Sequence, residues 1–374
     1  MISHEPDACV ECLRRARLLG HLAPYIERVA TGAPGSRSPE LLRLSNEDLV
    51  EAAAPRDARQ LLARVAATSE RCLRQGLATA ECWACCRHDP RFPTGLRDAA
   101  DAPWLLFGRG DPALLNELEP SAAVTVVGAR RATTYGRDVA RSLGRELAAA
   151  GIVVVSGLAF GIDGCAHRGA LTAGRTVAVL GCGVDVAYPA SHRSLWREIC
   201  ERGLVLSELP PRTGAWRWSF PARNRIMAAL AGMTVVVEAA ERSGSLITAD
   251  LAADLGRDLG AVPGPVGSRL SAGPNALLAG GACVVRDAQD VLDAMLGPGA
   301  RPIRVPGPPL SAETTPVLAA VERGAASCDV VASELGVPGG EAASALAELE
   351  ALGYVSCSAL GSYTRTALRA PEGI

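Results

Sequence analysis

Short apolar runs rich in β-branched residues recur through the middle of the chain, and amphipathic helical segments lie between them. Unbroken apolar runs of this length are typical of strands that are buried on both faces. Their alternation with helices, for example at 137–150 and 246–255, predicts an α/β fold built on a Rossmann-like, doubly wound parallel sheet. The predicted strands are 124–127, 152–155, 176–180, 204–206, 234–237, 259–262 and 282–285.

A helical period precedes this strand-rich region. Leucines recur at helical spacing over residues 9–76, and prolines such as Pro24 punctuate the helices, which predicts a small all-helical domain of the SAM or helix-hairpin-helix type. Residues 83–120 are rich in Pro and Asp and are predicted to lead into the sheet through a short strand at 104–107.

The C-terminal region has a third pattern. After a segment dominated by Gly and Pro, three helical segments precede a predicted hairpin at 356–368, which together predict a winged helix. From residue 301 onward the chain contains five Arg and eight Asp or Glu residues, so this region is acidic. We therefore favour a role in protein interaction over DNA binding for it. The expected parts are an all-helical domain at 1–76, a Rossmann-like domain at 77–297, a linker at 298–309 and a winged-helix domain at 310–374.

Composition excludes several classes of protein. The formal net charge of the 374 residues is −2, so a surface that binds nucleic acid has to be local. Every basic residue is Arg, which excludes a Walker A lysine, a Schiff-base lysine and a kinase lysine. No apolar run approaches the roughly 20 residues of a membrane span, and the N-terminus does not resemble a signal peptide. We expect a cytoplasmic protein with reduced thiols and no membrane association.

Two cysteine pairs have the internal spacing of a structural zinc site. About 70 residues separate the pairs, whereas compact zinc modules use roughly 12 to 20. One of the cysteines also falls on a helical segment that is expected to bury it as a small apolar side chain. We therefore predict no metal site. The pairs are Cys9 with Cys12 and Cys82 with Cys85, and Cys86 and His88 lie close to the second pair.

The first predicted strand runs into a turn that is suited to bind an anion. In VTVVGARRATTYG the strand ends at Gly128, Arg130 and Arg131 follow, and a long helix begins. Backbone N–H groups and the positive end of the helix dipole meet at such a junction, where a phosphate can bind. The turn lacks the second glycine of G-x-G-x-x-G, and no acidic residue ends the second strand. We therefore expect no nicotinamide or flavin cofactor.

Glycine and serine dominate the turns after the later strands. Ligands of such sheets bind at the carboxyl ends of strands, so these turns are candidate contacts. Asp163 and His167, four residues apart, could form an acid–base pair, but no orienting third group stands out. We favour the alternative in which Asp163 caps or pairs locally and His167 packs against the sheet edge, and we predict no catalytic residues. The candidate contacts in these turns are Ser156, Gly157, Gly161, Gly244 and Ser245.

Arginines alternate with aromatic residues between the fourth and fifth strands, in a chain with only 4% aromatic residues. Arginine for phosphates and aromatic rings for unstacked bases is typical of single-stranded nucleic-acid binding. The alternative is a core-packing loop whose arginines pair with Glu208 or Glu238. For the two tryptophans, this alternative explains the pattern about as well as nucleic-acid binding does. We favour binding for the cluster as a whole. Its members are Trp216, Arg217, Trp218, Phe220, Arg223 and Arg225.

The order of these motifs resembles the DNA-processing protein A family, also called DprA or Smf, over about residues 87–295. The matching motifs include VGARRATTYG, SGLAFGIDGCAH, AVLGCGVDVAYP, FPARNRI and VVVEAAERSGSLITA. The resemblance implies an extended Rossmann-like domain that binds single-stranded DNA in a basic pocket without enzymatic turnover. It also implies a homodimer that loads a RecA-type recombinase, protects incoming DNA and displaces single-strand-binding protein during natural transformation.

The family's pocket can be carried over to this chain by position. Arg217 stands where many relatives have Lys, which keeps the charge, and Ala129 stands where a hydroxyl residue is frequent. The pocket residues implied by the resemblance are Gly128, Arg130, Arg217, Phe220, Arg223, Asn224 and Arg225.

Two other functions compete with this interpretation. One is a Rossmann-type nucleotide-processing enzyme similar to the phosphoribohydrolases, whose P-G-G-x-G-T-x-x-E signature is replaced by ERSGSLITAD here. The other is a transcriptional regulator that acts through the predicted winged helix, which the acidic charge of that region weakens.

Overall fold

The computed structural model describes residues 6–32, 38–97, 99–300, 305–357, 361–365 and 368–369. The chain divides into two compact units, Met1–Arg301 and Pro302–Ile374. This division lies inside the predicted linker, of which residues 301–304 are outside the described part. The predicted boundary at residue 76 falls within α5 (Glu70–Thr79), inside the first unit.

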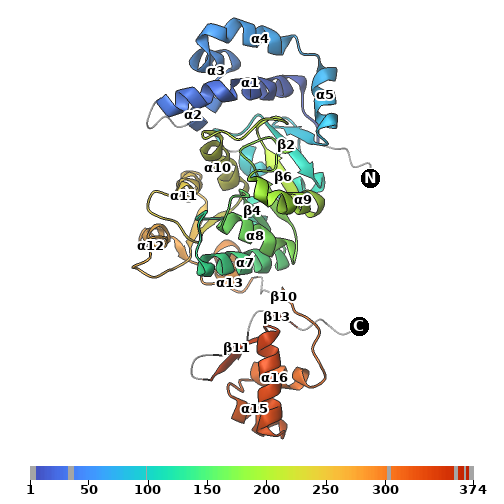
Figure 1. Ribbon diagram of the computed structural model, residues 1–374, viewed down its shortest axis with the longest axis vertical. Coiled ribbons are helices and arrows are strands. Elements are labelled where there is room, and N and C mark those ends of the chain that lie inside the picture. Colours follow the sequence, from blue (N-terminus) through green and yellow to red (C-terminus); the bar gives the residue numbers. More distant parts are fainter. Residues whose placement is uncertain are drawn as a thin grey trace. The chain divides into compact units, whose positions relative to one another are not determined.

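One sheet organises the first unit (Figure 1). Among the described residues it has nine strands in the order β1-β2-β6-β5-β4-β3-β7-β8-β9. The strands from β3 onward run parallel, whereas β2 pairs antiparallel with both β1 and β6. The bounds are β1 Trp83–Cys86, β2 Leu105–Gly110, β3 Ala123–Val127, β4 Val153–Ser156, β5 Thr176–Val179, β6 Leu204–Ser207, β7 Met233–Val236, β8 Asp258–Ala261 and β9 Cys283–Val284.

The predicted α/β fold with a mostly parallel sheet is confirmed. Every residue of β3, β4, β5, β6 and β7 is buried, as their unbroken apolar runs require. After β3 the chain adds β4, β5 and β6 on one side of that strand, and it then returns to add β7, β8 and β9 on the other side. The strand order therefore reverses at β3. Loops after these strands leave a crevice at such a switch point. β1 was not predicted, because its four residues lie beside loop-like sequence.

Helices cover both faces of the sheet. α7, α8 and α9 pack on one face, and α6, α10 and α11 pack on the other. The helices that follow the first five are α6 Thr94–Arg97, α7 Thr134–Ala149, α8 Ile162–Leu171, α9 Arg193–Arg202, α10 Ser219–Leu230, α11 Gly244–Asp254, α12 Ala272–Ala279 and α13 Ala288–Leu296.

The N-terminal helices form a further layer, drawn in blue in Figure 1. Leu22, Ile26 and Leu49 from this layer share a hydrophobic cluster with Trp218, which lies just before α10. Pro24 does not end α1, contrary to the sequence prediction. It is exposed while Leu22 and Ile26 beside it are buried, so packing of the apolar face holds the helix together. The bounds are α1 Val10–Gly32, α2 Ser38–Leu42, α3 Asn46–Ala53, α4 Ala58–Ala66 and α5 Glu70–Thr79.

The second unit has three helices and short strands in its described part. A small core of buried apolar residues, including Leu346, Leu349 and Tyr354, holds the helices together. Residues 358–360 and 366–367 of the predicted hairpin lie outside the described part. The bounds are α14 Thr314–Glu322, α15 Cys328–Leu335, α16 Gly339–Ala351, β10 Val305–Pro306, β11 Val355–Cys357, β12 Tyr363–Arg365 and β13 Leu368–Arg369, with β11 antiparallel to β12 and β10 parallel to β13.

A search for membrane spans found no candidate among the helices of the described residues, since none is both long enough and apolar enough.

Candidate nucleic-acid interface

A cavity of about 540 Å³ opens where the sheet reverses its strand order, and we call it the switch-point cavity. Turns after β3, β4, β5 and β7 form its wall together with α10. This is the edge at which open α/β sheets bind ligands. The lining residues are Val127, Gly128, Arg130, Ala159, Asp163, Tyr188, Arg217, Phe220, Pro221, Arg223, Asn224, Met227, Ser243, Gly244, Ser245, Ile247 and Thr248.

Cationic and aromatic side chains meet in this cavity. The guanidinium carbon of Arg130 lies 5.4 Å from the centroid of the Phe220 ring, and that ring lies 5.4 Å from the ring of Tyr188. Arg130 and Arg217 are exposed, and Tyr188 keeps 43% of its surface accessible. The charged lining residues are three arginines and the single carboxylate of Asp163, so the cavity carries a net positive charge.

The amino end of α11 adds a second feature that favours anions. Ser243 caps this helix by accepting a hydrogen bond from the backbone N–H of Ser245. Gly244 is exposed, and a Cβ built on it would meet nothing within 4 Å. The positive end of the α11 dipole therefore lies at the lining of the switch-point cavity.

Arg223 forms the floor of the cavity and is nearly buried. Its Nη1 donates to the carbonyl oxygen of Gly157 at 2.8 Å and to that of Val179. Asn224 accepts from Nε of Arg223 at 3.1 Å and donates to the carbonyl of Gly244 at 3.2 Å. These bonds fix α10 against the turn after β4 and the start of α11. The two residues hold the cavity's shape as well as line it.

Three of the candidate turn residues lie behind the cavity wall. Ser156 is buried and donates its hydroxyl hydrogen to the carbonyl of Val126 at 2.6 Å. A Cβ on Gly157 would lie 2.1 Å from the Arg223 guanidinium. Gly161 has φ +72°, and a Cβ there would lie 2.2 Å from the Ala129 carbonyl oxygen. These three residues allow close packing of the turns and are not among the cavity-lining residues.

Arg225 also lies outside the switch-point cavity. Its side chain is 3% exposed, and its Nη2 contacts both carboxylate oxygens of Glu208 at 2.8 and 2.7 Å. The alternative considered for the arginine cluster, pairing with Glu208, therefore holds for this residue. It points to the opposite side of α10 from Arg223, as expected for residues two apart on a helix.

The tryptophans of the cluster also belong to the core. Trp218 is 3% exposed, and its indole N–H donates to the carbonyl oxygen of Ala23 on α1 at 3.0 Å. Trp216 packs against the same cluster. Phe220 is therefore the member of the aromatic series that faces the cavity.

Asp163 and His167 have separate structural partners. The Asp163 carboxylate accepts the backbone N–H groups of Gly157 at 3.1 Å and Ala159 at 3.4 Å. Burial raises the pKa of this carboxyl, and the charge of Arg223 opposes that shift. His167 Nδ1 lies 2.8 Å from the hydroxyl of Thr176, which donates its own hydrogen to Val154. His167 therefore donates from Nδ1, and burial lowers the pKa of its ring so that the ring is neutral at pH 7. Both residues thus make the kind of local contact that the alternative favoured from the sequence expects.

The neutral state of His167 makes stability depend on pH. Complete burial lowers the pKa of His167 to about 3, with nearby Arg223 as a further cause. The unfolded chain takes up a proton near pH 6.5, so acidification below that value favours unfolding by about 1.4 kcal/mol per pH unit. We expect urea unfolding to show this loss between pH 6 and pH 4. His167→Gln is expected to flatten the profile, and equal slopes in both proteins would contradict this role.

The sequence did not single out several cavity residues. Tyr188, Ala159, Ser243, Ile247 and Thr248 line the cavity in addition to the predicted set. Tyr188 stands in GCGVDVAYP after the third strand, so its position at a strand's carboxyl end was a usable signal. Of the predicted residues, the structure brings together Gly128, Arg130, Arg217, Phe220, Arg223, Asn224, Gly244 and Ser245.

Comparisons with known proteins agree with this architecture. Protein Smf of Escherichia coli is 35% identical over 295 residues, covering 73% of this chain and 75% of its own length. The X-ray structure of DNA processing protein A from Streptococcus pneumoniae superposes with a TM-score of 0.60 at 33% identity, covering 76% of this chain and 95% of that one. The DNA processing protein A of Helicobacter pylori, described for its single-stranded DNA binding mode, matches with a TM-score of 0.50 at 33% identity, covering 55% and 92%.

A family model described as DNA recombination-mediator protein A matches residues 83–296, which include all strands of the central sheet. With more than half of the chain matched and relatives above 30% identity over most of their length, the chain belongs to the DNA recombination-mediator protein A family, DprA or Smf.

Proposed function

We propose that this chain binds single-stranded DNA in the switch-point cavity and acts as a recombination mediator without a catalytic step. The observation that carries the proposal is the grouping of Arg130, Arg217 and Arg223 with Phe220 and Tyr188 in one cavity. Arginine binds phosphate oxygens through paired N–H donors, and exposed rings stack on bases. The start of α11 offers a further phosphate position.

The half-buried position of the Phe220 ring favours a single strand over a duplex. Phe220 is half-buried between Arg130 and Tyr188, so a base has to leave its stack to reach it. Bases of a single strand are free to do so, whereas those of a duplex are already paired and stacked.

We further propose the finer roles that the family implies. They are a homodimer in the cytoplasm, loading of a RecA-type recombinase, and displacement of single-strand-binding protein during natural transformation. The family assignment supports these roles.

The second unit is proposed to be a winged helix that binds protein. The described part has the required helices and a pair of antiparallel strands. α16, in the position of a recognition helix, carries Glu341, Glu348 and Glu350 and no basic residue. Because phosphate contacts need basic side chains, a protein surface is the better match. We also propose that residues 1–76 form the small helical domain expected from the sequence.

Fluorescence anisotropy of labelled oligothymidine tests the proposed function. We expect tight binding whose affinity falls steeply with salt, by about 0.7 log units per phosphate contact for each tenfold rise in salt. Phe220→Ala is expected to weaken binding about 10-fold or more, because it removes one stacking platform. A duplex of equal length is expected to bind much more weakly.

Phe160→Ala is the matched control, because Phe160 is 46% exposed and is not among the cavity-lining residues. Oligothymidine binding that is insensitive to salt, or an equal decrease in both variants, would refute the cavity as the DNA site. Turnover of nucleoside monophosphates by the parent protein would instead support the phosphoribohydrolase alternative.

A further inference from the structure

Four potential metal ligands from two distant segments meet at the base of the N-terminal helical layer. They are the thiols of Cys9, Cys12 and Cys86 and the imidazole of His88, and their ligand atoms all lie within 4.8 Å of one another. Cys9 directly precedes α1 and Cys12 lies in its first turn, while Cys86 ends β1 and His88 follows in the next turn. No other such cluster was found among the described residues.

The three distances from the His88 ring nitrogen to the cysteine sulfurs fit a tetrahedral metal site better than a set of hydrogen bonds. Nδ1 of His88 lies 3.5 Å from Sγ of Cys9, 3.6 Å from Sγ of Cys12 and 3.7 Å from Sγ of Cys86. One ring nitrogen has a single hydrogen or a single lone pair, so it can make only one of these hydrogen bonds. In a tetrahedral zinc site, Zn–S bonds of about 2.3 Å and Zn–N bonds of about 2.0 Å place sulfur and nitrogen about 3.5 Å apart.

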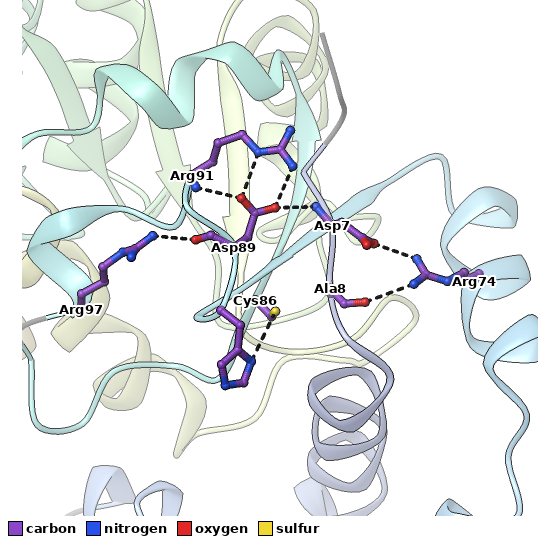
Figure 2. A network of polar contacts seen from close by, with 8 residues as sticks. Asp7, Ala8, Arg74, Cys86, Asp89, Arg91 and Arg97 are labelled. Carbon is purple, nitrogen blue, oxygen red and sulfur yellow. Dashed lines mark hydrogen bonds and ion pairs between the residues drawn. The ribbon is translucent and has the colours of Figure 1, made fainter. Parts of the chain in front are cut away.

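Hydrogen bonds and an ion pair next to the cluster hold the segment before α1 against the end of β1. Figure 2 shows Asp89 between Asp7 and Arg91, with Arg74 on the other side of Asp7. The N–H of Asp7 donates to the Asp89 carboxylate at 2.8 Å, and the N–H of Cys86 donates to the carbonyl of Asp7 at 3.2 Å. Arg74 pairs with Asp7 at 2.8 Å and also donates to the carbonyl of Ala8. The backbone next to the ligands is thus fixed before any metal binds, which lowers the cost of binding.

We propose that Cys9, Cys12, Cys86 and His88 bind one structural Zn²⁺ ion that joins the start of α1 to the end of β1. Three thiolates and one imidazole in tetrahedral positions are a zinc-type donor set, and four protein ligands leave no position open for catalysis. The ion closes a loop of about 70 residues that contains the N-terminal helices, so it stabilises their attachment to the sheet.

This ligand set differs from the one that cysteine spacing suggests. Cys82 and Cys85 form the second C-x-x-C pair, yet the structure places neither in the cluster. Successive side chains of a strand point to opposite faces, and Cys85 packs in the core on the other face of the sheet from Cys86. Cys82 lies before β1, and its thiol donates to the carbonyl oxygen of Leu77.

The proposal is tested by measuring the zinc content of the full-length protein. The protein is produced in zinc-supplemented medium and purified under reducing conditions. We expect one zinc per chain by mass spectrometry of the digested protein, and a fall to background in Cys86→Ser and His88→Ala. Cys82→Ser and Cys72→Ser are the matched controls and should keep the full zinc content. A chelator should release the ion from the parent protein and lower its Tm.

Cobalt substitution keeps the test decisive where a variant fails to fold. The parent protein loaded with Co²⁺ should show the visible bands of a tetrahedral site and a thiolate charge-transfer band in the near ultraviolet. X-ray absorption of the zinc form should give three sulfur ligands and one nitrogen ligand. Reduced parent protein that takes up no Zn²⁺, or zinc that survives in Cys86→Ser but is absent from Cys82→Ser, would overturn the proposal. Both readouts are independent of DNA binding.

Discussion

The double variant Arg130→Ala/Arg217→Ala is expected to bind oligothymidine at least about 100-fold more weakly than the parent protein. Both arginines are exposed at the rim of the switch-point cavity, where they are free to contact phosphate oxygens. Removing one charge-assisted hydrogen bond to a phosphate weakens binding by roughly tenfold or more. The salt slope is also expected to fall by about 1.4, because each of the two arginines contributes about 0.7 through its phosphate on a single strand.

Arg131→Ala is the control for this experiment. Arg131 is exposed beside Arg130 and carries the same charge, but it does not line the cavity. Its removal should therefore change affinity only slightly, through the long-range field. The double variant should keep the parent's Tm, since exposed arginines contribute little to stability. An equal decrease in affinity in Arg131→Ala and the double variant would show that general charge, and not the cavity, governs binding.

Glu208→Ala is expected to destabilise the protein by about 3 kcal/mol, because it removes the closer of the two carboxylates that pair with a buried cation. Arg225 is 3% exposed and Glu208 is 14% exposed, and the next carboxylate, that of Asp101, is 3.9 Å from the guanidinium. For a unit of this size the destabilisation corresponds to a fall in Tm of roughly 6 to 12 °C. Thermal unfolding followed by circular dichroism measures it.

Glu198→Ala provides the comparison, since Glu198 pairs with Arg202 on the exposed surface of α9. That pair should contribute less than about 1 kcal/mol. Arg225→Met separates the structural role from a role in DNA binding. Its oligothymidine affinity, measured well below its Tm, should match the parent's. A decrease in affinity with an unchanged Tm would place Arg225 back among the residues that bind DNA.

Local sequence patterns predicted the fold well because its strands are buried on both faces. The runs of β3 to β7 have no polar alternation, so their period alone identifies them. Position at strand ends likewise identified Gly128, Arg130, Gly244 and Ser245 as cavity residues, because parallel strands bring their carboxyl ends to one edge. These residues could be predicted because their place at a strand end follows from the local sequence and needs no knowledge of long-range contacts.

The sequence could not predict which residues of the FPARNRI segment line the cavity and which are buried elsewhere. Phe220, Arg223 and Arg225 all suit nucleic-acid binding, the ring by stacking and the arginines by binding phosphate, yet only Phe220 and Arg223 line the cavity. Which of them lines the cavity depends on which face of α10 packs on the sheet and on the position of Glu208, the residue after β6. Trp218 is likewise taken into the core by α1, almost 200 residues earlier in the chain.

The sequence by itself determined the α/β class, the strand series and the chemistry available at the strand ends, because burial period and turn composition are local properties. Only the tertiary structure decided which arginines face the cavity and which cysteines meet. Cys86 and His88 join Cys9 and Cys12, in place of Cys82 and Cys85, because the facing of β1 and the docking of α1 depend on contacts between residues far apart in the chain.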